Sequence, residues 1–149
     1  MPEIKFYHLQ RQRLEEALPK LVEKVCDAGL RAVIKVPDGA TIELLDKALW
    51  SFDPLSFIPH DKDGSAHPAA QSIFLTDGDE NPNESSVLIL VNAVDGPKMA
   101  EFDRCLYMFD GRDERIVAKA RADWAKLKDE GLEMSYWQQK ETGGWEKKA

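Results

Sequence analysis

Four side chains able to bind a metal ion or to carry out acid–base chemistry lie close together near residue 60. They are His60, Asp61, Asp63 and His67, which offer imidazole nitrogens and carboxylate oxygens. Their spacing matches no specific zinc pattern, and a polar surface loop is the commoner explanation. We therefore predict no metal and no other cofactor. A small α/β enzyme whose site is built from His60, His67 and nearby carboxylates is the alternative function.

Other patterns of catalytic chemistry are missing from the sequence. Neither Gly-x-x-x-x-Gly-Lys-Ser/Thr nor Gly-x-Gly-x-x-Gly occurs, and residues 10–13, Gln-Arg-Gln-Arg, follow the first expected strand without a glycine to cradle a phosphate. His8 lies in that strand, where a hydrogen-bonded structural histidine is usual, and no Gly-x-Ser-x-Gly elbow accompanies it. We predict a protein without catalytic residues of its own.

A basic segment near the C-terminus is the most informative candidate surface. Its positive side chains are Arg112, Arg115, Lys119, Arg121, Lys126 and Lys128. On most helices such charges form a solvated face laced with acidic residues. Trp124 follows Val117 at helical spacing, which is typical of core packing. Arg121 and Lys128 lie one turn to either side, so the indole could also floor a shallow cationic pocket.

Composition limits the classes of partner. The formal charge of −7 argues against a protein that grips nucleic acid over its whole surface, so direct nucleic-acid binding by the basic segment is a less favoured hypothesis and an anionic partner needs a local basic patch. Cys26 and Cys105 show no CxxC spacing, which favours free thiols in a reducing cytosol. No apolar run is long enough to cross a bilayer. We expect a cytoplasmic protein.

The order of elements predicts an α/β fold. Residues 4–9 and 32–36 read as strands, and residues 13–28 and 38–50 read as helices, with Asp38 as an N-cap. Strand, helix, strand, helix is a βαβ signal, which favours a central, largely parallel sheet flanked by helices. The expected architecture is P-loop-like without a nucleotide site, in a single domain spanning residues 1–149.

The second half of the chain continues this pattern. Strands are expected at 72–76, at 87–91 in the centre of the sheet, and at 134–139. Residues 102–109 fit helix or strand by pattern alone. The basic segment is a helix that begins at 113 or 114 and ends before Gly131. Residues 140–149 form a polar, flexible tail, partly ordered by Trp145.

The segment from Leu45 to His60 carries a resemblance to a known family. Two prolines make its second half a loop, and its bulky apolar residues, Trp50, Phe52, Phe57 and Ile58, either cover the core or offer a binding surface. The motif consists of Leu45-Asp46, Ala48-Leu49-Trp50, Ser56-Phe57 and Pro59-His60, supported by Phe6-Tyr7-His8-Leu9, Val87 to Val91, Ala120-Arg121 and Trp124. This combination resembles the chi subunit of bacterial DNA polymerase III, and it favours a strand at the end of 102–109.

The resemblance implies a non-catalytic accessory subunit of the polymerase holoenzyme, whose polymerase activity belongs to other subunits. In that family the basic helix receives the acidic C-terminal tail of single-stranded DNA-binding protein. Arg121 matches the family's key arginine and Trp124 its neighbouring aromatic residue. The family's lysine falls at Val117 here, so Arg115 or Lys119 is expected to replace it. Lys128 completes the predicted tail-binding set.

A second partner surface is also implied. The family binds the psi subunit, which links chi to the clamp loader, and the resemblance places that interface at Trp50 and Phe57. Psi or another clamp-loader component is therefore the expected second partner. DNA is contacted indirectly, through single-stranded DNA-binding protein.

Overall fold

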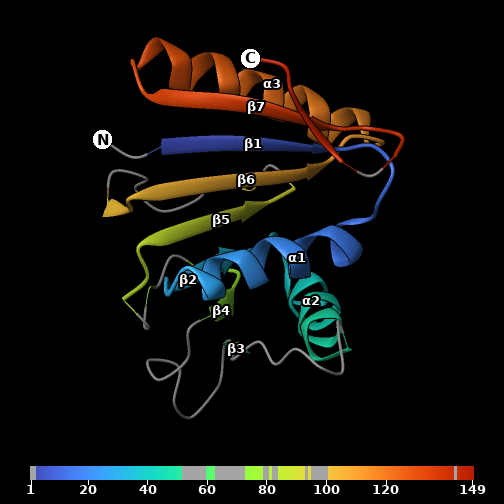
Figure 1. Ribbon diagram of the computed structural model, residues 1–149, viewed down its shortest axis with the longest axis vertical. Coiled ribbons are helices and arrows are strands. Elements are labelled where there is room, and N and C mark those ends of the chain that lie inside the picture. Colours follow the sequence, from blue (N-terminus) through green and yellow to red (C-terminus); the bar gives the residue numbers. More distant parts are fainter. Residues whose placement is uncertain are drawn as a thin grey trace.

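The computed structural model describes residues 3–51, 60–62, 73–78, 81, 84–92, 94, 101–142 and 144–149. Its strands form one sheet with the order β3-β4-β2-β5-β6-β1-β7-β8, in which every pair is parallel except β7 with β8 (Figure 1). The strands are β1 (Glu3–Leu9), β2 (Ala32–Lys35), β3 (His60–Lys62), β4 (Ile73–Thr76), β5 (Val87–Val91), β6 (Arg104–Asp110), β7 (Glu133–Gln139) and β8 (Trp145–Lys147). The predicted α/β class with a largely parallel sheet is confirmed.

Three helices in the described part of the chain cover the two faces of the sheet. Helices α1 (Leu14–Asp27) and α2 (Gly39–Ser51) pack on one face, and α3 (Glu114–Asp129) packs on the other. Alternate side chains of β1 divide between the faces: Ile4 and Phe6 belong to the core under α3, whereas Tyr7 packs against the core under α1. Strand β1 therefore serves both sides of the molecule.

Caps and stops predicted from the sequence define the helix ends. Asp38 Oδ1 accepts hydrogen bonds from the amide and hydroxyl of Thr41 at 2.8 Å each, next to the start of α2. Asp113 caps α3 by accepting from the amides of Arg115 and Ile116. Gly29 and Gly131 follow α1 and α3 with φ of 75° and 77°, the left-handed geometry that favours glycine.

Several expectations are settled by the sheet. Val87–Val91 is buried at the centre, as predicted, and the ambiguous segment before Asp110 is strand β6. Two short edge strands, β3 and β8, were not predicted, because three residues carry too little pattern to be recognised. Trp145 of β8 packs on Tyr7 with ring centroids 5.2 Å apart, so Trp145–Lys147 is ordered against β7.

Two further observations concern single residues. Pro19 lies inside α1 and is buried. Both cysteines are free: Cys105 is fully buried under α3, and Cys26 is half-buried on the α1 side. Within the described ranges, none of the helices combines the length and the apolar character that crossing a membrane requires.

Candidate functional site

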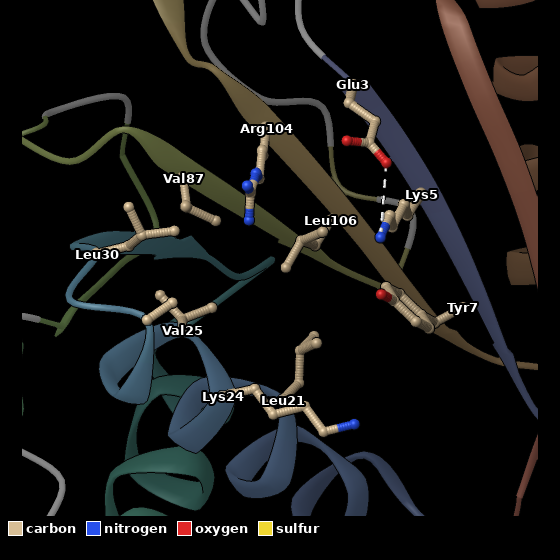
Figure 2. Close-up of a pocket in the computed structure, with 11 residues that line it drawn as sticks. Glu3, Lys5, Tyr7, Leu21, Lys24, Val25, Leu30, Val87, Arg104 and Leu106 are labelled. Carbon is tan, nitrogen blue, oxygen red and sulfur yellow. Dashed lines mark ion pairs between the residues drawn. The ribbon is translucent and has the colours of Figure 1, made fainter.

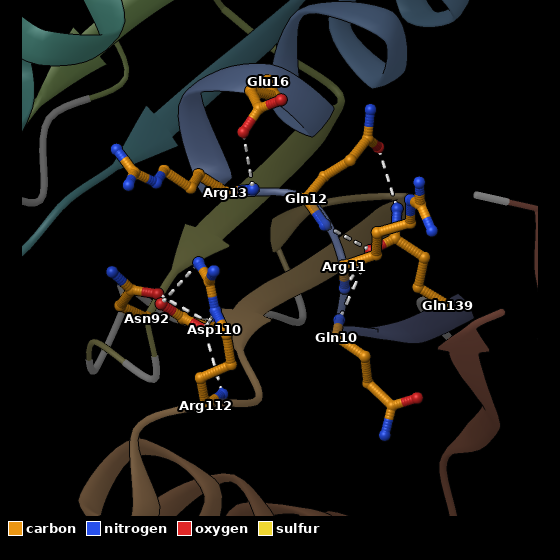
Figure 3. Close-up of polar contacts among 9 residues, drawn as sticks. All are labelled: Gln10, Arg11, Gln12, Arg13, Glu16, Asn92, Asp110, Arg112 and Gln139. Carbon is orange, nitrogen blue, oxygen red and sulfur yellow. Dashed lines mark hydrogen bonds and ion pairs between the residues drawn. The ribbon is translucent and has the colours of Figure 1, made fainter. Parts of the chain in front are cut away.

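The loop that leaves the C-terminal end of β1 closes on one side chain from β7. The backbone amides of Gln10, Arg11 and Gln12 donate to Oε1 of Gln139 over 3.3, 2.9 and 2.9 Å (Figure 3). Nε2 of Gln139 donates in turn to Oε1 of Gln12 at 2.8 Å. Gln139 is 1% exposed, so one buried carboxamide holds the turn between β1 and α1.

This arrangement explains how a P-loop-like sheet exists here without a phosphate cradle. In parallel α/β sheets, ligands bind beyond the carboxyl ends of the strands, and successive backbone amides in the first turn receive the phosphates. The corresponding amides of this chain already donate to the neutral oxygen of Gln139. No pattern in the sequence indicates this role, because the acceptor lies about 130 residues from the donors.

Helix α3 carries the predicted basic residues on two separate sides. An α-helix turns through about 100° per residue, so Lys119 and Arg121, two residues apart, project about 200° from one another. We call the side with Val117, Arg121, Trp124 and Lys128 the Arg121 flank. The side with Arg115, Lys119 and Lys126 is the Lys119 flank. The buried stripe between them contains Ala120 and Leu127.

The Lys119 flank faces β6 and is internally paired. Nζ of Lys119 lies 2.9 and 2.7 Å from the two carboxylate oxygens of Asp123, one turn along the helix. The hydroxyl of Tyr107, a buried residue of β6, donates to Oδ2 of the same carboxylate at 2.6 Å. Lys119 and Asp123 thus anchor the helix to the sheet.

The Arg121 flank faces β1 and β7 and adjoins an aromatic cluster. The half-buried indole of Trp124 meets Phe6 edge-on at 5.2 Å and Tyr136 edge-on at 5.5 Å. Phe6 also stacks on Tyr107 at 4.2 Å. Trp124 therefore packs against the core, as its spacing predicted, and keeps part of its surface exposed. Arg121 and Lys128 are exposed beside it.

A buried histidine lies within the electrostatic reach of Arg121. Nδ1 of His8 and the hydroxyl of Tyr136 are 2.6 Å apart. Burial lowers the pKa of His8, the positive charge of Arg121 lowers that pKa further, and Asp110 acts in the opposite direction. Burial also raises the pKa of Tyr136, against the influence of Arg121. Neutral His8 and the neutral phenol are therefore the favoured states at neutral pH.

Position 111, next to His8, has room only for glycine. A Cβ built on Gly111 would lie 2.1 Å from Nε2 of His8. The amide of Gly111 donates to the carbonyl of Leu9 at 2.7 Å, which fixes this close approach. Gly111 thus permits the packing that places His8 under the Arg121 flank.

The structure brings together only part of the predicted tail-binding set. Arg121, Trp124 and Lys128 share one flank, whereas Arg115 and Lys119 lie on the other. The expectation that Arg115 or Lys119 replaces the family's lysine beside Arg121 is thus unsupported by helix geometry. Val117, at the lysine's position, is half-buried on the Arg121 flank. A helical wheel drawn from the sequence alone already places Arg115 and Lys119 on a different side of the helix from Arg121.

Three hollows in the described part of the chain lie away from the Arg121 flank. One is shallow and lies at the start of α3, between Asp110 and Arg115. Two others lie on the α1 face. None of these three is lined by Arg121 or Trp124.

Two other predicted sites fall partly outside the described residues. His60 and Asp61 belong to the edge strand β3, while Asp63 and His67 lie outside the described ranges. The described residues contain no group of three or more His, Cys, Asp or Glu side chains able to hold a metal ion.

Trp50 lies near the end of α2 and is 61% exposed, whereas Phe57 lies outside the described residues.

Comparison with known proteins identifies the family. Residues 1–135 match the family model described as DNA polymerase III chi subunit, HolC. A protein of Rickettsia prowazekii (strain Madrid E), named probable DNA polymerase III subunit chi, is 31% identical over 109 residues. That alignment covers 73% of this chain and 66% of the relative, slightly less than two thirds of its length. The chain belongs to the DNA polymerase III chi subunit family.

Proposed function

We propose that this chain is a non-catalytic accessory subunit of the DNA polymerase III holoenzyme in DNA replication. In this role it binds the acidic C-terminal tail of single-stranded DNA-binding protein and associates with the clamp loader. Family membership supports the first part of the proposal. The observation that carries the second part is the Arg121 flank, where an exposed guanidinium and the exposed ammonium of Lys128 lie beside a half-buried indole.

The chemistry of such a flank suits a peptide C-terminus. A guanidinium forms strong, charge-assisted hydrogen bonds with a carboxylate, and an aromatic surface receives an apolar side chain. Lys128, one turn beyond Trp124, adds positive charge for a second acidic group of the tail. The Lys119 flank is less suited to this task, because the ammonium of Lys119 is engaged by Asp123.

Titration of a peptide ending in Asp-Asp-Ile-Pro-Phe tests the assignment. We expect salt-sensitive binding in the micromolar range, about −8 kcal/mol. Arg121→Ala should weaken this binding by roughly 1.5 to 3 kcal/mol, because it removes a charged hydrogen bond. Arg115→Ala is the matched control: it removes the same charge from the same helix, on the other flank, and should leave the affinity nearly unchanged. Equal losses in the two variants would indicate a general charge effect and contradict the assignment.

The second partner contact is assigned to Trp50 and Phe57, for which psi or another clamp-loader component is the proposed partner. An exposed indole at a helix end is a common anchor of protein interfaces, and 61% of Trp50 is exposed. Trp50→Ala should reduce co-purification of clamp-loader subunits and leave binding of the tail peptide unchanged. If Trp50→Ala instead abolished binding of the tail peptide and left co-purification of clamp-loader subunits unchanged, the assignment of the two surfaces would be reversed.

A further inference from the structure

A hollow on the face opposite α3 combines apolar walls with positive charge. It has a volume of 170 Å³ and lies between α1 and the N-terminal halves of β1 and β6. Its walls are aliphatic and come from several elements: Leu21, Val25, Leu30, Val87 and Leu106. Figure 2 shows Leu21 and Val25 of α1 pointing toward the strands. Neither the family motif nor the Arg121 flank includes these residues.

Three cationic residues line the same hollow. They are Lys5 of β1, Lys24 of α1 and Arg104 of β6, and Figure 2 shows Arg104 directed from its strand toward the helix. The acidic residue among the lining groups, Glu3, already pairs with Lys5, its Oε1 lying 3.5 Å from Nζ. The local charge is therefore positive in a chain whose formal charge is −7. Such a site attracts an anion locally, although the whole molecule repels one.

The positive surface continues along α1 toward β8. A second hollow, of 440 Å³, shares Tyr7, Leu21 and Lys24 with the first. Arg11 and Lys20 add two cations to its lining. We call the two hollows together the α1 groove. Lys20 and Lys24 are one helical turn apart, so their charges follow one another along the groove.

The combination of groups selects the chemistry of the occupant. Five aliphatic side chains form much of the wall of the first hollow, and the polar edge of a nucleobase that faced them would lose hydrogen bonds. An apolar side chain of a ligand fits those walls. The cations at the same hollow favour a ligand that also carries a negative charge within a few bonds of that side chain. A C-terminal residue with a large apolar side chain meets both needs, since its own carboxylate lies next to its Cα. Acidic residues that precede it would extend toward Lys20 and Arg11.

We propose that the α1 groove is a second docking site for an acidic peptide C-terminus, with the last side chain in the hollow and the terminal carboxylate at Arg104. The site lies across the sheet from the Arg121 flank, so one chain can hold two such tails at once. The choice of the tail of single-stranded DNA-binding protein as a probe rests on the proposed function. The location of the site rests on the hollow alone.

Calorimetric titration with the peptide ending in Asp-Asp-Ile-Pro-Phe counts the sites. Wild type should bind two peptides per chain, Arg121→Ala should retain the groove site, and Arg104→Ala with Lys24→Ala should retain the Arg121 site. Each retained site should lose less than about twofold in affinity, and each targeted site at least tenfold. Both targeted groove residues are exposed, so these variants should fold. Lys126→Ala, an exposed basic residue on the other flank of α3, is the control.

Two modified peptides test the chemistry of the groove, and an NMR readout distinguishes the two sites. Amidation of the C-terminus, or replacement of its Phe by Ala, should remove groove binding. Occupation of the groove should shift the methyl signals of Leu21, Val25 and Leu106 and leave the imidazole signals of His8 unchanged. Occupation of the Arg121 flank should raise the pKa of His8, because the bound carboxylate offsets the charge of Arg121.

Each outcome has a distinct meaning. A single site that is lost in Arg121→Ala, without methyl shifts in the groove, overturns the groove proposal and supports the Arg121 assignment. A single site that is lost only in the groove variants supports the groove and removes the Arg121 assignment. Groove binding of a thymidine oligonucleotide, with no response to the peptide, would overturn the proposal in favour of nucleic acid.

Discussion

The two basic regions of this molecule differ in how their charge is assembled. The Arg121 flank belongs to one helix, so its residues are neighbours in sequence at three- and four-residue spacing. The α1 groove draws its cations from β1, α1 and β6, together with the loop before α1. The first region is readable from the sequence, and its Arg121 and Trp124 line none of the three hollows described above. The second is invisible in the sequence and has an apolar cavity beside its charges.

The comparison teaches that charge density along the chain is a poor guide to where a binding site is enclosed. A helix concentrates charge easily, but successive side chains point about 100° apart around its axis, so three of the five basic residues of α3 face away from the other two. A groove between a helix and a sheet concentrates charge only after folding, and it provides walls at the same time. The following predictions separate the two regions by perturbing the elements that support each one.

Replacement of Gln139 should give the largest effect and should act on the groove side. Gln139→Ala leaves the amides of Gln10, Arg11 and Gln12 without their buried acceptor, and we expect a loss of about 3 kcal/mol in the free energy of unfolding. Gln138→Ala, at the adjacent half-buried residue, should cost less than about 1 kcal/mol. Urea denaturation measures both. Equal losses would show that the three amides do not depend on Gln139.

Replacement of Gly111 should have the second largest effect on stability, and it should act on the Arg121 flank. Gly111→Ala places a methyl group against the ring of His8 and should cost about 2 kcal/mol of stability by overpacking. Gly144→Ala is the matched control, because a Cβ at Gly144 meets no atom within 4 Å. Thermal unfolding of the two variants compares them. An unshifted Gly111→Ala would mean that both the ring of His8 and the backbone carbonyl of Leu9, 2.4 Å from the added Cβ, move aside freely, which would weaken the use of His8 as a reporter of the Arg121 flank.

The loss of stability at low pH should depend on the Arg121 flank and not on the α1 groove. The pKa of His8 is lowered from its ordinary value of 6.5 in the native state, so the unfolded chain takes up the proton first as the pH falls. Stability should therefore be intact above pH 6.5 and decline below it. Arg121→Ala should reduce this decline, because the pKa of His8 rises, whereas Arg104→Ala should not. Unfolding measured at about pH 7.5 and about pH 5.5 tests this. If wild type, Arg121→Ala and Arg104→Ala all lost the same stability at low pH, the charge of Arg121 would have no influence on the titration of His8.

Thiol labelling should give the smallest effect. Burial raises the pKa of Cys105 to about 12, and this thiol lies in the core beneath α3. Burial also raises the pKa of Cys26, but that side chain is half-buried on α1. A maleimide should therefore modify one thiol per native chain, at Cys26, and both after unfolding. Modification of Cys105 at a similar rate would indicate that the α3 face opens readily.

Local features of the fold were predictable because they depend on local chemistry. The cap at Asp38, the stop at Gly131 and the buried run of Val87–Val91 each follow from a few adjacent residues. The edge strands β3 and β8 were missed, because short strands take their form from the neighbour with which they pair. Local pattern therefore gives the elements of the sheet but not its borders.

The candidate sites were predictable to a smaller extent. The resemblance supplied Arg121 and Trp124, and the ordinary geometry of a helix would have separated Lys119 from them. The hydrogen bonds from residues 10–12 to Gln139 and the approach of Arg104 to α1 join segments far apart in the chain. No spacing in the sequence encodes such contacts, since they depend on strand order, with β1 between β6 and β7.

The carboxamide of Gln139 has a consequence for how the first turn of this fold keeps its shape. Where related architectures need a phosphate to shape their first turn, this chain carries the shaping group as a permanent part of itself. The chain therefore shapes its β1–α1 junction with its own buried side chain, so the geometry of that junction does not depend on a bound nucleotide.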